Sequence, residues 1–107
     1  MSYIFEMKPG DRKRALKYKT SDYETGGDKF AAATVMFRMM DDLGAVAVDG
    51  AATVLDGDGI LGYAWEDGET DEVNTYRGEF VVTFGDGLED TYPSSGFIIV
   101  RINQEVA

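Results

Sequence analysis

The chain is 107 residues long, 44% of its residues are hydrophobic and 12% are aromatic, and its formal net charge is −10. This length predicts one domain, residues 1–107, that is large enough to bury a core, and the apolar content excludes a disordered chain. Because the sequence contains no Cys and no His, it excludes disulfides, thiolate metal sites and His-based catalytic triads.

Membrane insertion and secretion are not expected either. No apolar run approaches the roughly 18 residues that a membrane span needs. In the N-terminal MSYIFEMKPGDRKR the charges follow the apolar residues, which is not the order of a signal peptide.

The charges are unevenly distributed along the chain. Residues 1–38 contain eight Lys and Arg against five acids, a local charge of +3, whereas residues 39–107 contain two against fifteen, a local charge of −13. Since the acidic part repels phosphate, we expect no nucleic-acid partner for the basic stretch KPGDRKRALKYK. Two interpretations stay open. In the first, the Lys and Arg side chains protect an edge strand against aggregation. In the second, a basic edge binds an acidic neighbour, and this neighbour could be the acidic half of another copy.

The N-terminal third of the chain predicts three strands. Weaker strands are indicated at 3–8 and 15–20, on either side of the turn residues Pro9-Gly10-Asp11. The segment ATVMFRMM at 33–40 alternates between apolar and other residues, which is the period of a half-buried strand. The face that we expect to be buried consists of Val35, Phe37 and Met39.

The middle of the chain predicts three more strands, two weaker ones at 45–48 and 51–56 and a stronger one at 59–66. Asp49-Gly50 and the DGDG of Asp56–Gly59 are hairpin signals between them. In the third strand, Leu61, Tyr63 and Trp65 share the face that we expect to be buried.

The C-terminal third predicts strands at 76–84 and 96–103, separated by Gly-containing and Pro-containing turns. The sequence has no pattern of an amphipathic helix. About seven short strands therefore predict an all-β, antiparallel immunoglobulin-like β-sandwich. For the last strand we choose the buried face that leaves Arg101 in water. The residues expected to be buried are Tyr76, Phe80, Val82 and Phe84 in the first strand and Ile98, Val100 and Ile102 in the second.

Two acidic stretches are candidate cation sites. The DGDG of Asp56–Gly59 lacks the further oxygen ligand, the glycine and the flanking helices of an EF-hand loop, and a hairpin turn explains it. The loop Glu66–Glu72 has five carboxylates within seven residues and could hold a hard cation. Runs of like charge are nevertheless more often solvated, so we predict no metal and no cofactor.

Catalysis is not expected. No pair of acids is singled out for glycoside hydrolysis, Ser94-Ser95 has no base, and no helix follows a Gly-rich phosphate loop. The alternative function is a carbohydrate-binding or host-adhesion β-sandwich module, which would need an exposed aromatic side chain at a loop tip. Tyr23 and Tyr92 are the candidates for that role.

Several segments together resemble the immunoglobulin-like N-terminal module of bacteriophage upper baseplate and related tail proteins. These are ATVMFRMM, DGDGILGYAW and TYRGEFVVTFGDG with the following TYP and IIVRI, and the resemblance covers residues 3–103. It implies a non-enzymatic virion structural protein of the tail, baseplate or neck, assembled in the bacterial host cytoplasm. Its partners would be other virion proteins, with a homo-oligomer within the particle. The sequence departs from such modules at Arg12-Lys13-Arg14, where small, polar or proline residues are usual.

Apolar residues on faces that the alternation assigns to the outside predict a protein interface. Several of them lie on strands that an immunoglobulin-like topology places side by side, where monomers rarely leave a large apolar patch in water. The alternative is that a terminal segment folds back over this patch. We expect no membrane and no small-molecule partner. The candidate interface consists of Val81, Phe97 and Ile99, with the basic residues Arg12, Lys13 and Arg14 nearby.

Overall fold

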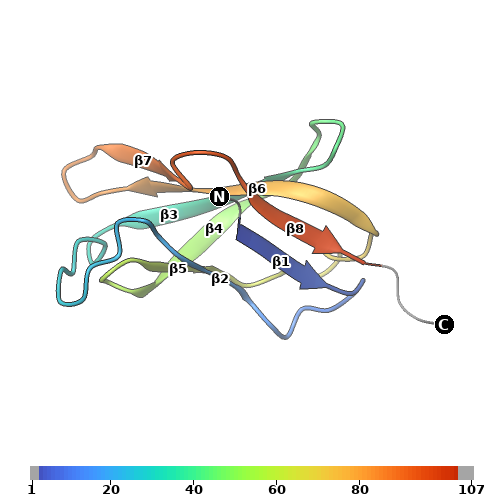
Figure 1. Cartoon of the computed structure of the whole chain (residues 1–107), viewed down its shortest axis with the longest axis horizontal. Coiled ribbons are helices and arrows are strands. Elements are labelled where there is room, and N and C mark those ends of the chain that lie inside the picture. Colours follow the sequence, from blue (N-terminus) through green and yellow to red (C-terminus); the bar gives the residue numbers. More distant parts are fainter. Residues whose placement is uncertain (1–2, 104–107) are drawn as a thin grey trace.

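The computed structural model describes residues 3–103, which form eight β-strands (Figure 1). None of the described residues belongs to a helix that is long and apolar enough to cross a membrane. The strands are β1 (Tyr3–Met7), β2 (Leu16–Lys19), β3 (Thr34–Met40), β4 (Val46–Asp56), β5 (Ile60–Tyr63), β6 (Asn74–Thr83), β7 (Glu89–Tyr92) and β8 (Ile98–Ile102).

β6 is the centre of the larger sheet. It pairs antiparallel with β3 along one side, and on its other side with β8 along its first half and with β7 along its second half. β4 pairs with β3, and β1 pairs in parallel with β8. The smaller layer consists of β5, β2 and the end of β4.

β4 joins the two layers. Its residues 46–52 pair with β3, whereas residues 53–56 pair with β5. The hydrogen-bonded order β1-β8-β6-β3-β4-β5-β2 therefore runs continuously from one layer into the other. β1 and β2 are the two ends of this order.

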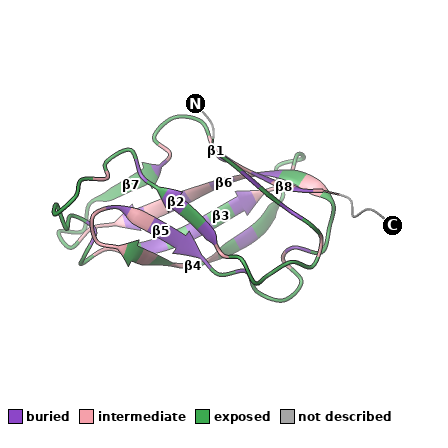
Figure 2. Ribbon diagram, turned by 60° about the horizontal axis from the view of Figure 1, so that its bottom comes forward, coloured by how far each residue is buried: buried purple, intermediate pink, exposed green. Residues whose placement is uncertain are grey.

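The core lies between the layers and follows the predicted alternation. Figure 2 shows buried residues along the strands that face one another. Phe37 is the centre of an aromatic cluster, with its ring centroid 4.9 to 6.0 Å from those of Phe80, Tyr63 and Trp65. Phe84 is only partly buried, against Phe30. The predicted residues that are buried are Val35, Phe37, Met39, Leu61, Tyr63, Trp65, Tyr76, Phe80, Val82, Ile98, Val100 and Ile102.

The all-β sandwich is confirmed, with eight strands where about seven were predicted. Asp49-Gly50 is not a turn, because β4 continues through it. A Cβ at Gly50 would lie 3.1 Å from the Tyr63 hydroxyl, so close packing explains this glycine. The sequence does not predict β7, since its EDTY lacks an apolar alternation and only Tyr92 of the strand is buried. The single domain over 1–107 stays a prediction, because residues 1, 2 and 104–107 lie outside the described residues.

Candidate functional site

β1 is an edge strand with backbone groups on its open side. Within residues 3–103 it pairs with β8 and with no other strand. The Asn103 N–H donates to the Met7 carbonyl at 2.8 Å, so the backbone groups of Met7 point towards the β8 side. Because backbone groups alternate between the two sides of a strand, those of Ile4 and Glu6 point to the open side.

β2 is the other edge strand. In the described part of the chain its only strand partner is β5. The Thr20 N–H donates to the Gly59 carbonyl at 2.9 Å on the β5 side. By the same alternation, the backbone groups of Lys17 and Lys19 point away from β5. Their side chains are exposed, whereas Leu16 and Tyr18 are buried.

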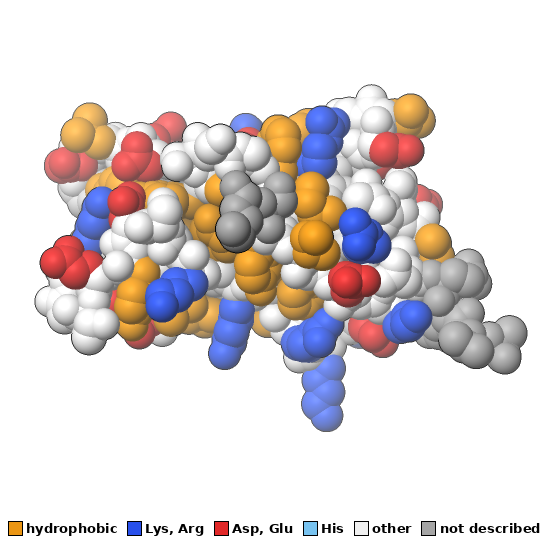
Figure 3. All heavy atoms as spheres, in the orientation of Figure 1, with side chains coloured by type: hydrophobic (Ala, Val, Ile, Leu, Met, Phe, Trp, Pro, Cys, Tyr) orange, Lys and Arg blue, Asp and Glu red, His pale blue; other side chains and the backbone are white. Residues whose placement is uncertain are grey.

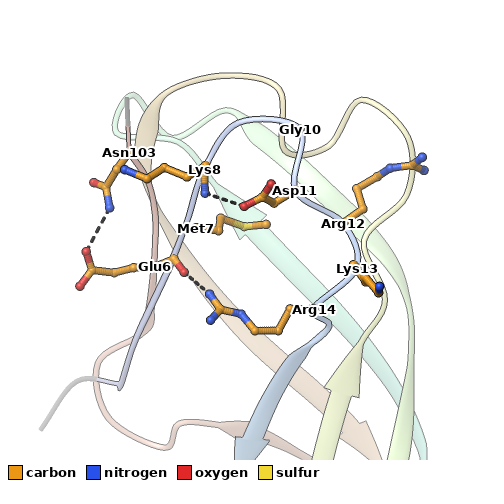
Figure 4. A pocket seen from close by; sticks show the side chains of 9 residues that line it. All are labelled: Glu6, Met7, Lys8, Gly10, Asp11, Arg12, Lys13, Arg14 and Asn103. Atoms are coloured by element: carbon orange, nitrogen blue, oxygen red, sulfur yellow. Dashed lines mark hydrogen bonds between the residues drawn. The ribbon is translucent and has the colours of Figure 1, made fainter. Parts of the chain in front are cut away.

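Side chains link the two edges where no backbone ladder does. The rings of Tyr3 and Tyr18 meet edge to face, with centroids 5.6 Å apart. Arg14 precedes β2 and reaches across to β1, where its guanidinium donates to the Glu6 carbonyl and lies 4.8 Å from the centre of the Phe5 ring. Figure 4 shows Arg14 pointing towards Glu6. These contacts place the two open edges on the same side of the sandwich.

A groove lies between these edges, and we call it the edge groove. It consists of two hollows that share Glu6 and Arg14 in their walls. One hollow, of about 610 Å³, lies between the strands and has the apolar β1 side chains on one wall. The other, of about 830 Å³, lies beside the loop that joins β1 to β2. The first hollow is lined by Tyr3, Ile4, Phe5, Glu6, Arg14, Ala15 and Lys17.

The edge groove is positively charged in an acidic protein. Residues 3–19 contain six Lys and Arg against two acids, a local charge of +4, whereas the whole chain carries −10. The Glu6 carboxylate accepts a hydrogen bond from the Asn103 amide at 3.0 Å. Figure 3 shows the molecule in the orientation of Figure 1, with Lys and Arg side chains along the lower part of the visible surface, below a band of hydrophobic side chains. An apolar wall beside a basic rim is complementary to a segment that is acidic and partly apolar.

The structure divides the predicted interface residues between two places. Arg12, Lys13 and Arg14 line the edge groove. The other three lie partly buried on or beside the larger sheet. Val81 is opposite Met36 and Thr91, whereas Ile99 is opposite Arg77, further back along β6.

The apolar patch predicted on the larger sheet is interrupted by charged residues. The Arg77 guanidinium lies 5.4 Å from the centre of the Phe97 ring. Arg38 and Glu79 are cross-strand neighbours in the row between Arg77 and Val81, and Arg38 also pairs with Asp49 at 3.6 Å. Val81, Phe97 and Ile99 therefore do not form one continuous surface, and their role in an interface stays a prediction.

The DGDG turn has a structural task. The Asp58 carboxylate accepts hydrogen bonds from the N–H groups of Gly26 and Asp28, both at 3.0 Å. These backbone hydrogen bonds hold the pKa of Asp58 below its ordinary value. Gly59 has φ of 131°, and a Cβ there would lie 2.7 Å from the Thr20 hydroxyl. The turn therefore anchors the loop between β2 and β3.

Within residues 3–103, no three Asp, Glu, His or Cys side chains come together as a possible metal site. In the acidic loop Glu66–Glu72, the Glu69 carboxylate accepts hydrogen bonds from the Tyr63 hydroxyl at 2.7 Å and from the Glu66 N–H at 2.8 Å. Burial and the neighbouring Glu69 raise the pKa of Tyr63 above its ordinary range. This carboxylate therefore stabilises the start of its own loop.

The two aromatic candidates for sugar binding are both occupied within the fold. Tyr92 is 2% exposed, and its hydroxyl donates to the Asp22 carboxylate at 2.6 Å. Tyr23 is half-buried, with the Lys19 ammonium 4.3 Å from the centre of its ring. Neither ring offers the free face at a loop tip that a sugar platform needs.

Comparisons with known proteins give a similarity of fold. No protein-family model matches the chain, and no curated protein has a detectably similar sequence. Among solved structures, the chain is similar to the crystal structure of CopC from Methylosinus trichosporium OB3b. The TM-score is 0.57 at 15% sequence identity, over 99% of this chain and 87% of that one.

This similarity corrects the function predicted from the sequence. CopC is not a virion component, and the predictions of a phage structural role and of a virion location are wrong. The alternative, a carbohydrate-binding or host-adhesion module, has no support from the comparison or from the positions of Tyr23 and Tyr92. The sequence resemblance to the phage modules is itself not addressed by any comparison and stays a prediction.

The sequence did not single out the β1 side of the edge groove. Tyr3, Ile4 and Glu6 become groove residues because β1 pairs with β8 from the far end of the chain, and no local pattern encodes that pairing. A signal was present on the β2 side. Lys17 and Lys19 flank the apolar Tyr18, and this alternation of Lys with buried residues is typical of a protected edge strand.

Proposed function

We propose that this protein is a non-enzymatic β-sandwich that works by binding another protein at the edge groove. The observation that carries the proposal is the position of two open sheet edges beside one another, with a basic rim and an apolar wall between them. Exposed edges bind protein segments readily because their backbone groups still have hydrogen bonds to make.

The charge of the surroundings supports an acidic protein partner. Arg12, Lys13 and Lys17 are exposed at the groove, whereas the body of the protein is strongly acidic. That net charge opposes long nucleic acids and anionic membrane surfaces, which present an extended negative field to the whole molecule. A short acidic segment meets only the local positive field.

Self-association through two edge grooves is disfavoured by the same charges. A symmetric contact would bring the basic residues of one copy against those of the other, and like charges repel. The predicted homo-oligomer therefore requires that an acidic surface of one copy enters the groove of the next. We propose a different acidic protein as the partner and treat the homo-oligomer as an outcome of the experiment.

A cross-linking experiment in the source cells tests this function. A photoreactive amino acid at Ala15, which lines the groove and carries no charge, should capture one defined protein, and the same group at the exposed Leu88, which does not line the groove, should not. The captured protein is then purified and its affinity measured. The double variant Arg12→Glu/Lys17→Glu should bind it about tenfold more weakly or worse.

The matched control reverses two charges away from the groove. Lys29→Glu/Arg38→Glu changes the net charge by the same amount, and neither residue lines the groove. We expect this control to keep the affinity within about threefold at 150 mM salt, where exposed distant charges are screened. Equal losses in both double variants, or none in the groove variant, would overturn the proposal. Capture of a second copy of the chain would identify a homo-oligomer instead.

A further inference from the structure

We infer that the occupant of the edge groove is an extended acidic segment that adds to β2 as a further strand. This inference rests on the proposed function and specifies how the partner binds. The open edge of β2 provides the backbone N–H and C=O groups of Lys17 and Lys19. Strand addition uses such a row of groups for affinity, and the side chains beside it give specificity.

β2 is the better of the two edges for this purpose. On β1, the Glu6 carbonyl already accepts a hydrogen bond from Arg14. Thus one of the outward-facing groups of β1 is used within the fold. Within residues 3–103, the outward backbone groups of Lys17 and Lys19 make no hydrogen bond. Arg14 therefore leaves β2 as the edge with the longer row of available groups.

The alternation of β2 specifies the alternation of its partner. Side chains that lie opposite one another on paired strands point to the same face. Residues opposite Lys17 and Lys19 would stand outside beside their ammonium groups, so acidic residues spaced by two are favoured there. The residues between them would point inward, towards the apolar wall formed by Tyr3, Ile4 and Phe5. The chemistry expected of the segment is alternating acidic and apolar residues.

The length of β2 limits the length of the segment. β2 has four residues and the neighbouring β1 has five. A paired segment of about five residues spans roughly 17 Å at 3.3 to 3.4 Å per residue. The basic loop at Arg12 and Lys13 continues beyond the end of β2, so further acidic residues beyond the paired part would also meet positive charge.

A synthetic peptide tests the inference. The probe is an acetylated and amidated peptide of about seven alternating glutamate and valine residues, and the control peptide has the same composition with all glutamates before the valines. We expect the alternating peptide to bind the full chain about tenfold more tightly than the control peptide. Binding of both with equal affinity, or of neither at about 1 mM, would overturn the inference.

Amide hydrogen exchange reports the backbone contact directly. At saturating peptide, the exchange of the Lys17 and Lys19 N–H groups should slow by about tenfold or more, because each becomes part of a sheet ladder. The N–H of Tyr18 points towards β5 and serves as the internal control. If the peptide binds while Lys17 and Lys19 exchange as before, side chains alone hold it and strand addition is wrong.

N-methylation of the peptide gives a second measurement. Alternate residues of the added strand direct their N–H groups to β2, so methylating one alternate set should weaken binding about tenfold and methylating the other set should change it far less. Equal tolerance of both sets would contradict the inference. One outcome separates the two proposals. If a partner cross-links at Ala15 and its binding is lost on charge reversal, but neither amide is protected, the proposed function stands and only the strand addition is removed.

Sedimentation of the protein alone distinguishes the remaining occupant. One outcome is a concentration-dependent dimer that the Lys17→Glu substitution dissociates and that the peptide displaces. That result would assign the groove to a second copy and overturn the inference that its occupant is an acidic segment of another protein. A monomer over the same concentrations supports the inference.

Discussion

The centre of the larger sheet and the edge groove are built from the same alternating pattern, yet they use it differently. At the pair β3 and β6, both neighbours of every strand are present and the inward residues are buried completely, as in Phe37 and Phe80. At β1 and β2, each strand has one neighbour among the described residues. Most of their inward residues are also buried, as in Leu16 and Tyr18, but the first inward residue of β1, Tyr3, stays 39% exposed. The difference lies in the backbone: strands of the centre are hydrogen-bonded on both sides, which favours stability, whereas β1 and β2 each keep one side open for binding.

The largest effect should come from the centre. Phe37 is fully buried and packs against three aromatic rings, so Phe37→Ala should lower the free energy of unfolding by about 3–5 kcal/mol. Its outward neighbour provides the control, since Met36 is 41% exposed and Met36→Ala should cost less than about 1 kcal/mol. Urea unfolding followed by the fluorescence of Trp65, which is 5% exposed, measures both. Equal losses would show that the two faces of β3 are not distinct.

A smaller effect is expected where the core meets the surface. Tyr92→Phe removes the hydrogen bond to Asp22 and should cost about 1 kcal/mol at neutral pH. The hydrogen bond from the Tyr92 hydroxyl holds the pKa of Asp22 below its ordinary value. Desolvation opposes this effect in part, and the nearby Lys29 adds to it. A carboxyl with a lowered pKa contributes stability above its unfolded value of about 3.9, and this contribution is lost as the pH falls through the folded pKa.

The difference between wild type and Tyr92→Phe should therefore shrink in the acid range. Thermal unfolding at pH 7 and then at successively lower pH values down to about 2 measures it. Asp22→Asn is the companion variant, because it removes the titrating group and should make the cost of Tyr92→Phe independent of pH. A gap between the two proteins that persists unchanged at the lowest pH would contradict the assignment to Asp22.

The edge should tolerate substitution. Arg14→Ala removes the contact with the Phe5 ring and the hydrogen bond to the Glu6 carbonyl, and we expect a loss of only about 0.5 to 1 kcal/mol because the site is exposed. The measurement is urea unfolding of the two proteins in parallel. A loss as large as that of Phe37→Ala would mean that the edges contribute to stability as much as the centre does.

Calcium should have the smallest effect. Within residues 3–103 no group of acids forms a possible metal site, and the Asp58 carboxylate is occupied by two N–H groups. Millimolar calcium should therefore leave the melting temperature nearly unchanged. A site at 100 times its dissociation constant would add about 2.7 kcal/mol, so a rise of many degrees would reveal a site at an acidic loop.

The core could be predicted from the sequence because it depends on local alternation. The inward sets of β3, β6 and β8 follow a period of two along each strand, and burial of one face explains them. Leu61 and Tyr63 of β5 keep the same spacing, although Gly62 between them is buried as well. The prediction of a turn at Asp49-Gly50 is wrong because a glycine fits two situations. Both a tight turn and close packing against a side chain, here Tyr63, favour glycine.

The edge groove could be predicted only in part. The sequence predicts the basic residues Arg12–Arg14 as part of an interface, and Lys17 and Lys19 lie on a strand that the structure shows at an edge. Which strand lies opposite them depends on the pairing of β1 with β8 and on the passage of β4 between layers. Both are long-range pairings, and a single sequence contains no local signal for them.

The parallel pairing of β1 with β8 has a consequence for the order in which the protein is made. Tyr3 is opposite Ile98 and Met7 is opposite Ile102, so a nascent chain holds its first strand unpaired until translation has passed almost all of the others. Phe5, which is buried in the finished protein, lacks its β8 neighbour Val100 during this time. Folding on the ribosome can therefore build the centre early but cannot complete the sandwich before the last strand has emerged.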